Sequence, residues 1–171
     1  LAITFYPASI YLSAKKKTQL TFGARARDPV VSINGDRIVF VQNRPGGTQL
    51  AICDIDGKNI KPLYIPEVQV RITRPEWLSE SEILFVERDL KGIELIKKLE
   101  LTTRNISVAE NWQSLQPLHF PRAQKNGIFF VADGSGLANV YFAKGWNQPA
   151  RPVTNTATRM MTAEWDEKSN D

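Results

Sequence analysis

Short apolar runs recur along the chain at a fixed spacing, separated by Gly, Pro, Asn and Asp residues. Three of these runs begin 45 residues apart, at Ile38-Val39-Phe40, Ile83-Leu84-Phe85 and Ile128-Phe129-Phe130. β-Branched and aromatic residues in runs of this length predict strands. A second series begins twelve residues after the first, at Leu50, Leu95 and Val140. Two series that stay in phase indicate an internal repeat of 45 residues.

Two further strand candidates complete each repeat. One precedes the isoleucine-led run and begins at a proline, at Pro29, Pro75 and Pro117. The other follows the second series and covers residues 61–64, 105–108 and 151–154. Four short strands per unit, with little room for helix, are typical of a β-propeller blade. The predicted fold class is therefore all-β, a β-propeller of four-stranded antiparallel blades, with about four blades in this chain.

A β-sandwich is the competing all-β architecture, but it gives no reason for a phase-locked repeat. We expect residues 1–171 to form one propeller domain or propeller segment. Its blade units are predicted at about 1–22, 27–65, 73–108 and 116–154, with 160–166 starting or closing a blade. Residues 2–5 and 10–12 fit the second and third strands of an opening blade, which a strand around Trp165 would complete in a closed ring. The alternative is an arc of a larger ring, whose end blades would expose unpaired edges.

The first full unit carries more than a period. It combines a Pro-containing first strand, a Ser-x-x-Gly turn, an Ile-x-Phe strand, an Arg-x-Gly loop and an Asp-Gly turn, at Pro29, Ser32 with Gly35, Ile38 with Phe40, Arg44 with Gly46, and Asp56 with Gly57. This pattern resembles the TolB-type, WD-like propeller repeat family. The resemblance covers about residues 18–165 and weakens in later units, where Glu80-Ser81-Glu82 replaces the turn glycine and Gly145-Trp146-Asn147 replaces the Asp-Gly turn. It implies a propeller fold and a bacterial protein of the periplasm or cell envelope, without excluding the cytoplasm.

Composition adds limits to this picture. The chain is 42% hydrophobic and 23% charged, which is typical of a globular protein. A net charge of +4 is too small an excess to predict a nucleic-acid partner. No apolar run reaches the ~18 residues of a membrane helix, so we expect no membrane span in this segment. Because the chain begins at Leu1 without a leader pattern, we interpret it as a mature or excised piece of a longer product.

Candidate catalytic residues are sparse. His119 is the only histidine, so a His-rich metal site is impossible, and its place between apolar neighbours predicts a channel-lining or structurally hydrogen-bonded residue. Cys53, the only cysteine, is expected to be a buried and inert thiol. Asp54–Asn59 starts like a calcium loop, but Ile65 stands where the bidentate Glu should be, so a turn is the better interpretation. We expect no metal, no cofactor and no catalytic constellation in this segment.

The four tryptophans divide into two pairs. Trp77 and Trp165 occupy equivalent first-strand positions, which predicts core packing between blades. Trp112 and Trp146 fall in predicted turns and are expected to be the more exposed pair.

The remaining surface for function is one end of the propeller. There, loops that join one blade to the next share the channel mouth with loops that join second and third strands. These loops are predicted at 23–29, 66–75, 109–117, 155–161, 42–48, 87–92 and 132–138. Our candidate binding residues among them are Arg27, Arg44, Arg74, Arg88, Asp133 and Arg159. The same loops also hold Arg25, Asp28, Arg71, Glu87 and Asp89.

Arginine dominates this predicted rim, and it is suited to bidentate carboxylate contacts and to interfaces. We therefore expect a non-enzymatic propeller module for protein or peptide interaction, with a partner that carries acidic groups. Exposed loops of any basic protein also carry arginine, so a rim without a partner is the other interpretation. The alternative function is the substrate-gating propeller of a prolyl-oligopeptidase-like or tricorn-like peptidase whose catalytic domain lies outside this chain. A gene-length sequence with a downstream G-x-S-x-G domain would favour the peptidase.

Overall fold

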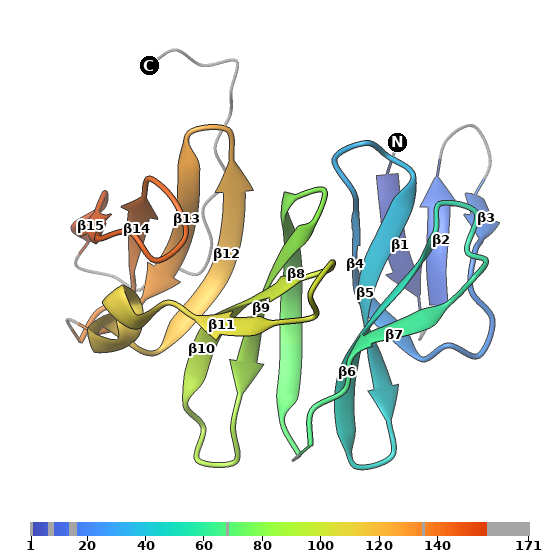
Figure 1. The fold of residues 1–171 in the computed structure, drawn as a ribbon, viewed down its shortest axis with the longest axis horizontal. Coiled ribbons are helices and arrows are strands. Elements are labelled where there is room, and N and C mark those ends of the chain that lie inside the picture. The colour runs from blue at the N-terminus through green and yellow to red at the C-terminus, as the bar shows by residue number, and fades with distance from the viewer. Residues whose placement is uncertain (1, 7–8, 14–16, 68, 135, 157–171) are drawn as a thin grey trace.

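The computed structural model describes residues 2–6, 9–13, 17–67, 69–134 and 136–156. They form four antiparallel sheets and one short 3-10 helix (Figure 1). The first sheet has three described strands, β1 (Ala2–Tyr6), β2 (Ser9–Ser13) and β3 (Lys17–Gln19). The next two sheets contain β4 (Ala26–Val31), β5 (Arg37–Arg44), β6 (Gly47–Asp54) and β7 (Lys61–Tyr64), then β8 (Arg71–Ser79), β9 (Glu82–Arg88), β10 (Glu94–Glu100) and β11 (Ile106–Val108).

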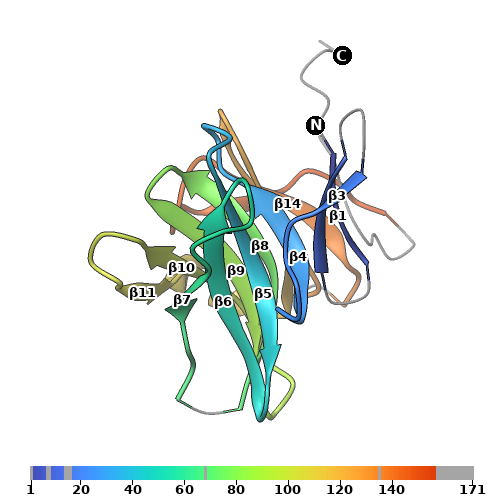
Figure 2. The same cartoon turned by 90° about the vertical axis from the view of Figure 1, so that its right-hand side faces the viewer.

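The last sheet follows the helix η1 (Glu110–Leu115) and contains β12 (Leu118–Gln124), β13 (Gly127–Ala132), β14 (Asn139–Ala143) and β15 (Ala150–Pro152). In each four-stranded sheet, neighbours in space are neighbours in sequence. The innermost strand β8 contacts both β4 and β12, the innermost strands of the neighbouring sheets. Figure 2 shows the outer strands β7 and β11 on the opposite side from β4 and β8. This arrangement is an all-β propeller arc, as predicted from the repeat.

The phase of the repeat is confirmed in space. Ile38, Ile83 and Ile128 are each the second residue of β5, β9 and β13, and none of the three is exposed. The second series of apolar runs lies in β6, β10 and β14, as predicted. The sequence period therefore corresponds to one blade.

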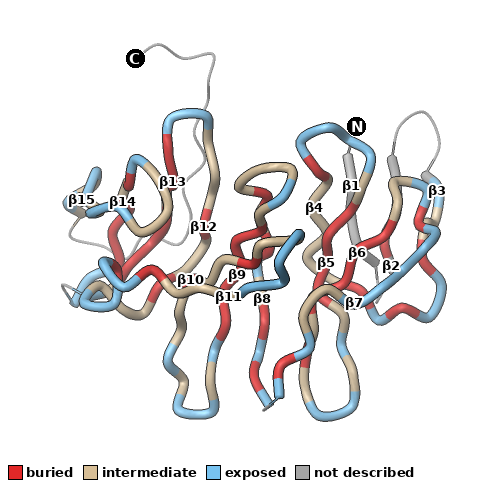
Figure 3. The backbone as a smooth tube through the Cα atoms, viewed as in Figure 1, coloured by how far each residue is buried: buried red, intermediate tan, exposed pale blue. Residues whose placement is uncertain are grey.

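The second strands are apolar without alternation because both of their faces are buried. In β5, Ile38 and Phe40 pack toward the first sheet, beside Ile10, whereas Val39 and Val41 pack toward the sheet of β8. Successive side chains of a strand point to opposite faces, so a strand between two neighbours needs apolar residues at every position. Figure 3 shows the result, with burial in mid-strand and exposure at the hairpins.

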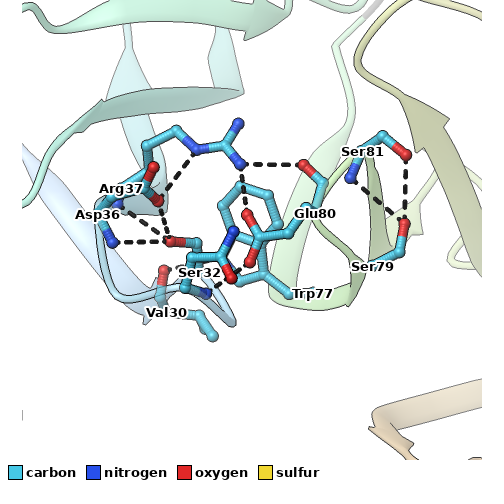
Figure 4. Close-up of polar contacts among 9 residues, drawn as sticks. Val30, Ser32, Asp36, Arg37, Trp77, Ser79, Glu80 and Ser81 are labelled. Carbon is cyan, nitrogen blue, oxygen red and sulfur yellow. Dashed lines mark hydrogen bonds and ion pairs between the residues drawn. The ribbon is translucent and has the colours of Figure 1, made fainter.

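Neighbouring blades are also joined by polar contacts. Between β4–β5 and β8–β9, Arg37 Nη2 donates to Glu80 Oε2 at 2.5 Å and to the Glu80 carbonyl at 3.0 Å, while the Asn34 N–H donates to Glu80 Oε1 (Figure 4). The Trp77 indole N–H donates to the Val30 carbonyl at 3.1 Å. Glu80, which replaces the turn glycine of the repeat, therefore holds the preceding blade.

Two predicted turns are confirmed. Gly35 has φ +78° and donates to the Ser32 carbonyl, and Gly57 has φ +82° and donates to the Asp54 carbonyl. A Cβ at Gly57 would lie 2.1 Å from the Leu20 carbonyl oxygen, so this turn also needs glycine for close approach to the first sheet.

The described strands of the first sheet agree with an opening blade. β1 and β2 contact β4 of the next sheet, as β5 and β6 contact β8, so they are the counterparts of a second and a third strand. Residues 160–166, including Trp165, lie outside the described residues. Among the residues that the structure describes, no helix is long and apolar enough to cross a membrane.

The expectation that Trp112 is exposed is wrong. Trp112 lies in η1 and is fully buried, with its ring stacked on Phe130 at 4.5 Å between centroids. Its indole N–H donates to the Gln148 carbonyl at 2.7 Å. Trp146 lies in a turn, as predicted, but its ring packs edge-on against Trp112 at 5.3 Å between centroids and is partly buried. The segment that contains Trp112 folds back onto the last sheet, and this contact cannot be predicted from the residues of the segment itself.

Candidate interaction site at the channel mouth

The same irregularity occurs in all three innermost strands of the four-stranded sheets. The pairing register shifts between Arg27 and Val30 in β4, between Thr73 and Glu76 in β8, and between His119 and Arg122 in β12. The extra residue of each bulge has positive φ, at Asp28 (+50°), Arg74 (+53°) and Phe120 (+50°). Each of these residues precedes a proline. A β-bulge in the same place in three blades is a repeated feature that redirects side chains.

These bulges are strained. Positive φ is uncommon for residues other than glycine, and a following proline restricts the preceding residue further. Each such residue costs about 1 to 3 kcal/mol, and strain of this kind collects at functional sites. The repetition of an unfavourable backbone at Asp28, Arg74 and Phe120 therefore marks this level of the channel as the candidate site.

The bulges line one pocket of about 360 Å³. Six of its lining residues are the bulge residues and the residues before them, Arg27, Asp28, Thr73, Arg74, His119 and Phe120. The others are Arg71, Val86, Arg88, Glu94 and Val131. Three successive blades therefore contribute to a single concave surface.

The β5–β6 and β9–β10 hairpins lie at one end of the propeller, at the bottom of Figure 1. The pocket lies toward this end, because its lining includes Arg88 and Glu94 on either side of the β9–β10 hairpin. Arg71 and Arg88 are the strand ends nearest this rim, at the start of β8 and the end of β9. The β4–β5, β8–β9 and β12–β13 turns lie at the opposite end, at the top of Figure 1.

Arg27 is held in place by the bulges. Its Nη1 donates to Asp28 Oδ2 at 2.9 Å, and its Nη2 donates to the Ile72 carbonyl of the next blade at 2.6 Å. Burial lowers the pKa of Arg27 below its ordinary value; Asp28 opposes this shift, and the charges of Arg71 and Arg74 lower the pKa further. Arg27 therefore bridges two blades and experiences the positive charge gathered in the pocket.

The other arginines are more available. No described carboxylate pairs with the side chain of Arg71 or Arg74. The Arg74 guanidinium lies over the ring of Phe120, with Cζ 4.5 Å from the centroid, and Arg74 is exposed. Arg88 makes only a long ion pair, 3.9 Å from Glu94 Oε1, and its side chain is 51% exposed.

His119 joins two blades at the wall of this pocket. Its Nδ1 lies 2.5 Å from Glu94 Oε2 of β10, and its Nε2 is buried without a hydrogen-bond partner among the described residues. This confirms the prediction of a channel-lining, hydrogen-bonded histidine. Cys53 is buried as predicted, and burial, with help from Asp54 and Asp56, raises the pKa of its thiol to about 11.

The predicted rim residues are divided by the structure. Arg27, Arg74 and Arg88 line the pocket together. Arg44 lies at the end of β5 and donates to the Pro66 carbonyl, and Asp133 follows β13; neither lines the pocket. Arg159 lies outside the described residues.

Several predicted placements need correction. Four residues expected in loops between blades lie within β4 and β8 instead: Arg27, Asp28, Arg71 and Arg74. Glu87 was expected in a rim loop, but it is buried in β9 and accepts hydrogen bonds from the Tyr64 hydroxyl and the Lys97 ammonium. The counterpart of Pro29 and Pro75 is Pro121, not Pro117, because the bulges align at positions 28, 74 and 120.

Sequence reasoning missed Thr73, Glu94 and Phe120 as pocket residues. A signal for part of this set is present in the sequence, because Asp28-Pro29, Arg74-Pro75 and Phe120-Pro121 follow one another in steps of 46 residues. The second strands recur every 45 residues instead, because the segment between the bulge and the second strand loses one residue from each blade to the next. Glu94 has no such signal, since it reaches His119 from another blade.

The fold is similar to that of solved structures. A protein assigned as TolB from Agrobacterium tumefaciens gives a TM-score of 0.76 at 10% identity, over 91% of this chain and 58% of that chain. TolB from Acinetobacter baumannii gives 0.72 at 13% identity, over 90% and 40%. An oligogalacturonate lyase from Vibrio parahaemolyticus gives 0.65 at 12% identity, over 87% and 46%.

These likenesses concern the fold, since all three identities are low. The present chain spans 58%, 40% and 46% of the three chains, so each of those proteins is considerably longer. No family model and no curated protein sequence matches the chain. The antiparallel four-stranded sheets and these structural neighbours together show that the chain has a TolB-like β-propeller fold.

Proposed function

We propose that this chain is a non-enzymatic propeller module that binds a protein or peptide partner at the channel mouth. The observation that carries the proposal is the repeated, strained bulge that brings arginines from neighbouring blades into one pocket. The bulges place Arg27 and Arg74 in the channel, and backbone strain of this kind collects at functional sites. The proposed partner carries acidic groups, because the pocket gathers four arginines against Asp28 and Glu94.

Apolar side chains in the loops of the same end support a polypeptide partner. Phe22 is 78% exposed in the connection that precedes β4, and Ile65 is exposed in the connection that follows β7. Leu90 is 79% exposed in the β9–β10 hairpin, and Ile93 is also exposed there. Exposed apolar groups beside arginines are characteristic of interface anchors.

The proposal places the module in the bacterial cell envelope or periplasm, following the resemblance of its repeat to that of envelope propellers. Cell fractionation with an antibody to the native protein tests this location. Recovery in the cytoplasmic fraction alone would contradict it.

The binding function is tested by charge reversal. Arg74→Glu with Arg88→Glu should weaken capture of a specific partner, identified by mass spectrometry, from an extract of the native organism. Because both side chains lie at the pocket, the salt dependence of capture should flatten, while the melting temperature stays nearly unchanged.

A matched control reverses two charges at the opposite end. Lys58→Glu with Lys125→Glu changes the net charge equally, and both residues are exposed in turns away from the pocket. Undiminished capture of the same partner by the folded Arg74/Arg88 variant would remove the channel mouth from consideration. Equal loss in both variants would indicate bulk electrostatic attraction instead of a site.

A further inference from the structure

We propose that Arg71 and Arg74 form a fork that binds one carboxylate, an acidic side chain of the partner polypeptide. This inference rests on the proposed function and adds the chemistry of the anchor. It separates two classes of arginine in the pocket, those that bind the ligand and those that hold the blades.

Arg27 belongs to the second class. Both of its terminal nitrogens are engaged, one with Asp28 and the other with the Ile72 carbonyl. The Arg74 main-chain N–H also donates to Asp28 Oδ2, at 3.3 Å. Asp28 therefore joins Arg27 to the neighbouring bulge. The charge of Arg27 is neutralised by Asp28, so Arg27 is not the residue that pairs with an incoming acidic ligand.

Arg71 and Arg74 belong to the first class. They lie three positions apart on β8, both line the pocket, and neither side chain has a described carboxylate partner. The Arg74 guanidinium lies over the Phe120 ring, with Cζ 4.5 Å from the centroid, and this contact limits the positions that the side chain can take. A planar guanidinium held in this way is preorganised for two parallel hydrogen bonds to a carboxylate.

The two carboxylates in the pocket lining limit the negative charge that a ligand can carry. Asp28 and Glu94 lie in the pocket beside the arginines and would repel a phosphate dianion more strongly than a single carboxylate. The exposed Leu90 and Ile93 lie in the hairpin between Arg88 and Glu94, two residues that line the pocket, and they offer apolar contact to a polypeptide that carries the acid. A glutamate or aspartate side chain within an extended segment meets both conditions.

The test uses a fluorescein-labelled hexaglutamate peptide with an amidated C-terminus and follows its anisotropy on titration with this chain. Arg71→Gln with Arg74→Gln should reduce the affinity at least about tenfold, whereas the charge-matched control Lys58→Gln with Lys125→Gln should change it less than about twofold. Melting temperatures of both variants check that each remains folded.

A conservative variant separates a fork from simple charge. Arg71→Lys with Arg74→Lys keeps both charges but removes the paired N–H groups, so it should lose most of the affinity that the glutamine variant loses. Full binding by the lysine variant would overturn the fork. Unchanged binding by the folded glutamine variant would overturn the anchor itself.

Two competitors test the ligand class. Inorganic phosphate that displaces the labelled peptide more effectively than glutarate would overturn the choice of a carboxylate. A hexaglutamine peptide with a free C-terminus that competes as well as hexaglutamate would assign the site to chain ends, against the proposal.

If the native partner is still captured at the channel mouth while the Arg71/Arg74 variant binds hexaglutamate normally, the proposed function stands and only this inference fails.

Discussion

The guanidinium of Arg37 lies over the indole of Trp77 in the next blade, with Cζ 5.0 Å from the ring centroid. The same guanidinium reaches Glu80, and the same indole donates to the Val30 carbonyl (Figure 4). Arg37 and Trp77 therefore join the same two blades both by stacking on each other and by hydrogen bonds. Because each blade of a repeat protein is stabilised by its neighbours, these two residues are expected to contribute to the stability of the whole arc.

Trp77→Ala should lower the free energy of unfolding by about 3 to 5 kcal/mol, the range for truncation of a large buried aromatic residue. Trp77 is only 4% exposed and packs with Val39, Ile52 and Ile83. Chemical denaturation measures the change, with Phe22→Ala as the control, since Phe22 is 78% exposed. Equal small losses in the two variants would mean that Trp77 is not a core residue.

Trp112→Ala should be about as costly as Trp77→Ala, because Trp112 is fully buried against Phe130 and its indole N–H is satisfied by Gln148. The same denaturation experiment decides between this expectation and the smaller loss suggested by its place in a turn. A loss below about 1 kcal/mol would show that η1 detaches from the last sheet at little cost.

A double-mutant cycle should measure the bridge between blades. Arg37 and Glu80 are each about one-third exposed, so their coupling energy is expected to be about 0.5 to 1 kcal/mol, the upper part of the range for exposed pairs. The cycle uses Arg37→Ala, Glu80→Ala and the double variant, each unfolded at low and at 1 M salt. High salt should reduce the coupling. A coupling that does not respond to salt would contradict an ion pair as its source.

The Cys53 thiol should be unreactive in the folded protein. Burial raises its pKa to about 11, and the reactive species is the thiolate. At pH 8, iodoacetamide should modify the folded chain at least about 100-fold more slowly than the chain unfolded in urea, where the thiol returns to a pKa of about 8.5. Mass spectrometry at timed intervals measures both rates. Similar rates would show that the strand β6 opens readily under native conditions.

Glu76 should make stability depend on pH. Burial raises the pKa of this carboxyl above its ordinary value, although Arg122 and the Ala123 N–H oppose the shift. The folded state then binds the proton more tightly than the unfolded state, so the contribution of Glu76 to stability is greatest at low pH. This contribution declines as the pH rises from the ordinary carboxyl value through the folded pKa.

The comparison with Glu76→Gln isolates this effect. The difference in unfolding free energy, wild type minus variant, should increase as the pH falls from 7 to about 4, because titrations at other sites cancel. Denaturant titrations at several pH values measure it. A difference that shrinks on acidification would show that the ion pair with Arg122 dominates over burial.

Much of the fold could be predicted from the sequence because its signal is local and repeated. Ile38, Ile83 and Ile128 mark the second strand of each four-stranded blade, since a strand buried on both faces needs a continuous apolar run. The turn at Gly57 could also be predicted, because an Asp-Gly pair supplies the positive φ that the turn requires. These features depend on residues that lie next to one another in the chain.

The tertiary structure decided which distant residues meet. The sequence predicted a rim rich in arginine and named Arg27, Arg74 and Arg88, but it did not separate them from Arg44, which the structure places outside the pocket. Glu94 meets His119 only because two blades converge on the channel.

The burial of Trp112 and the course of the bulges were likewise decided in three dimensions. Trp112 lies in a segment that looks like a loop, and it is buried only because that loop folds onto the next blade. The bulges at Asp28, Arg74 and Phe120 adopt a backbone that local preference disfavours, so they persist only where the packing of adjacent blades imposes it. The sequence thus determined the blades, whose signal is apolar periodicity, while the packing of blades around the channel determined the pocket.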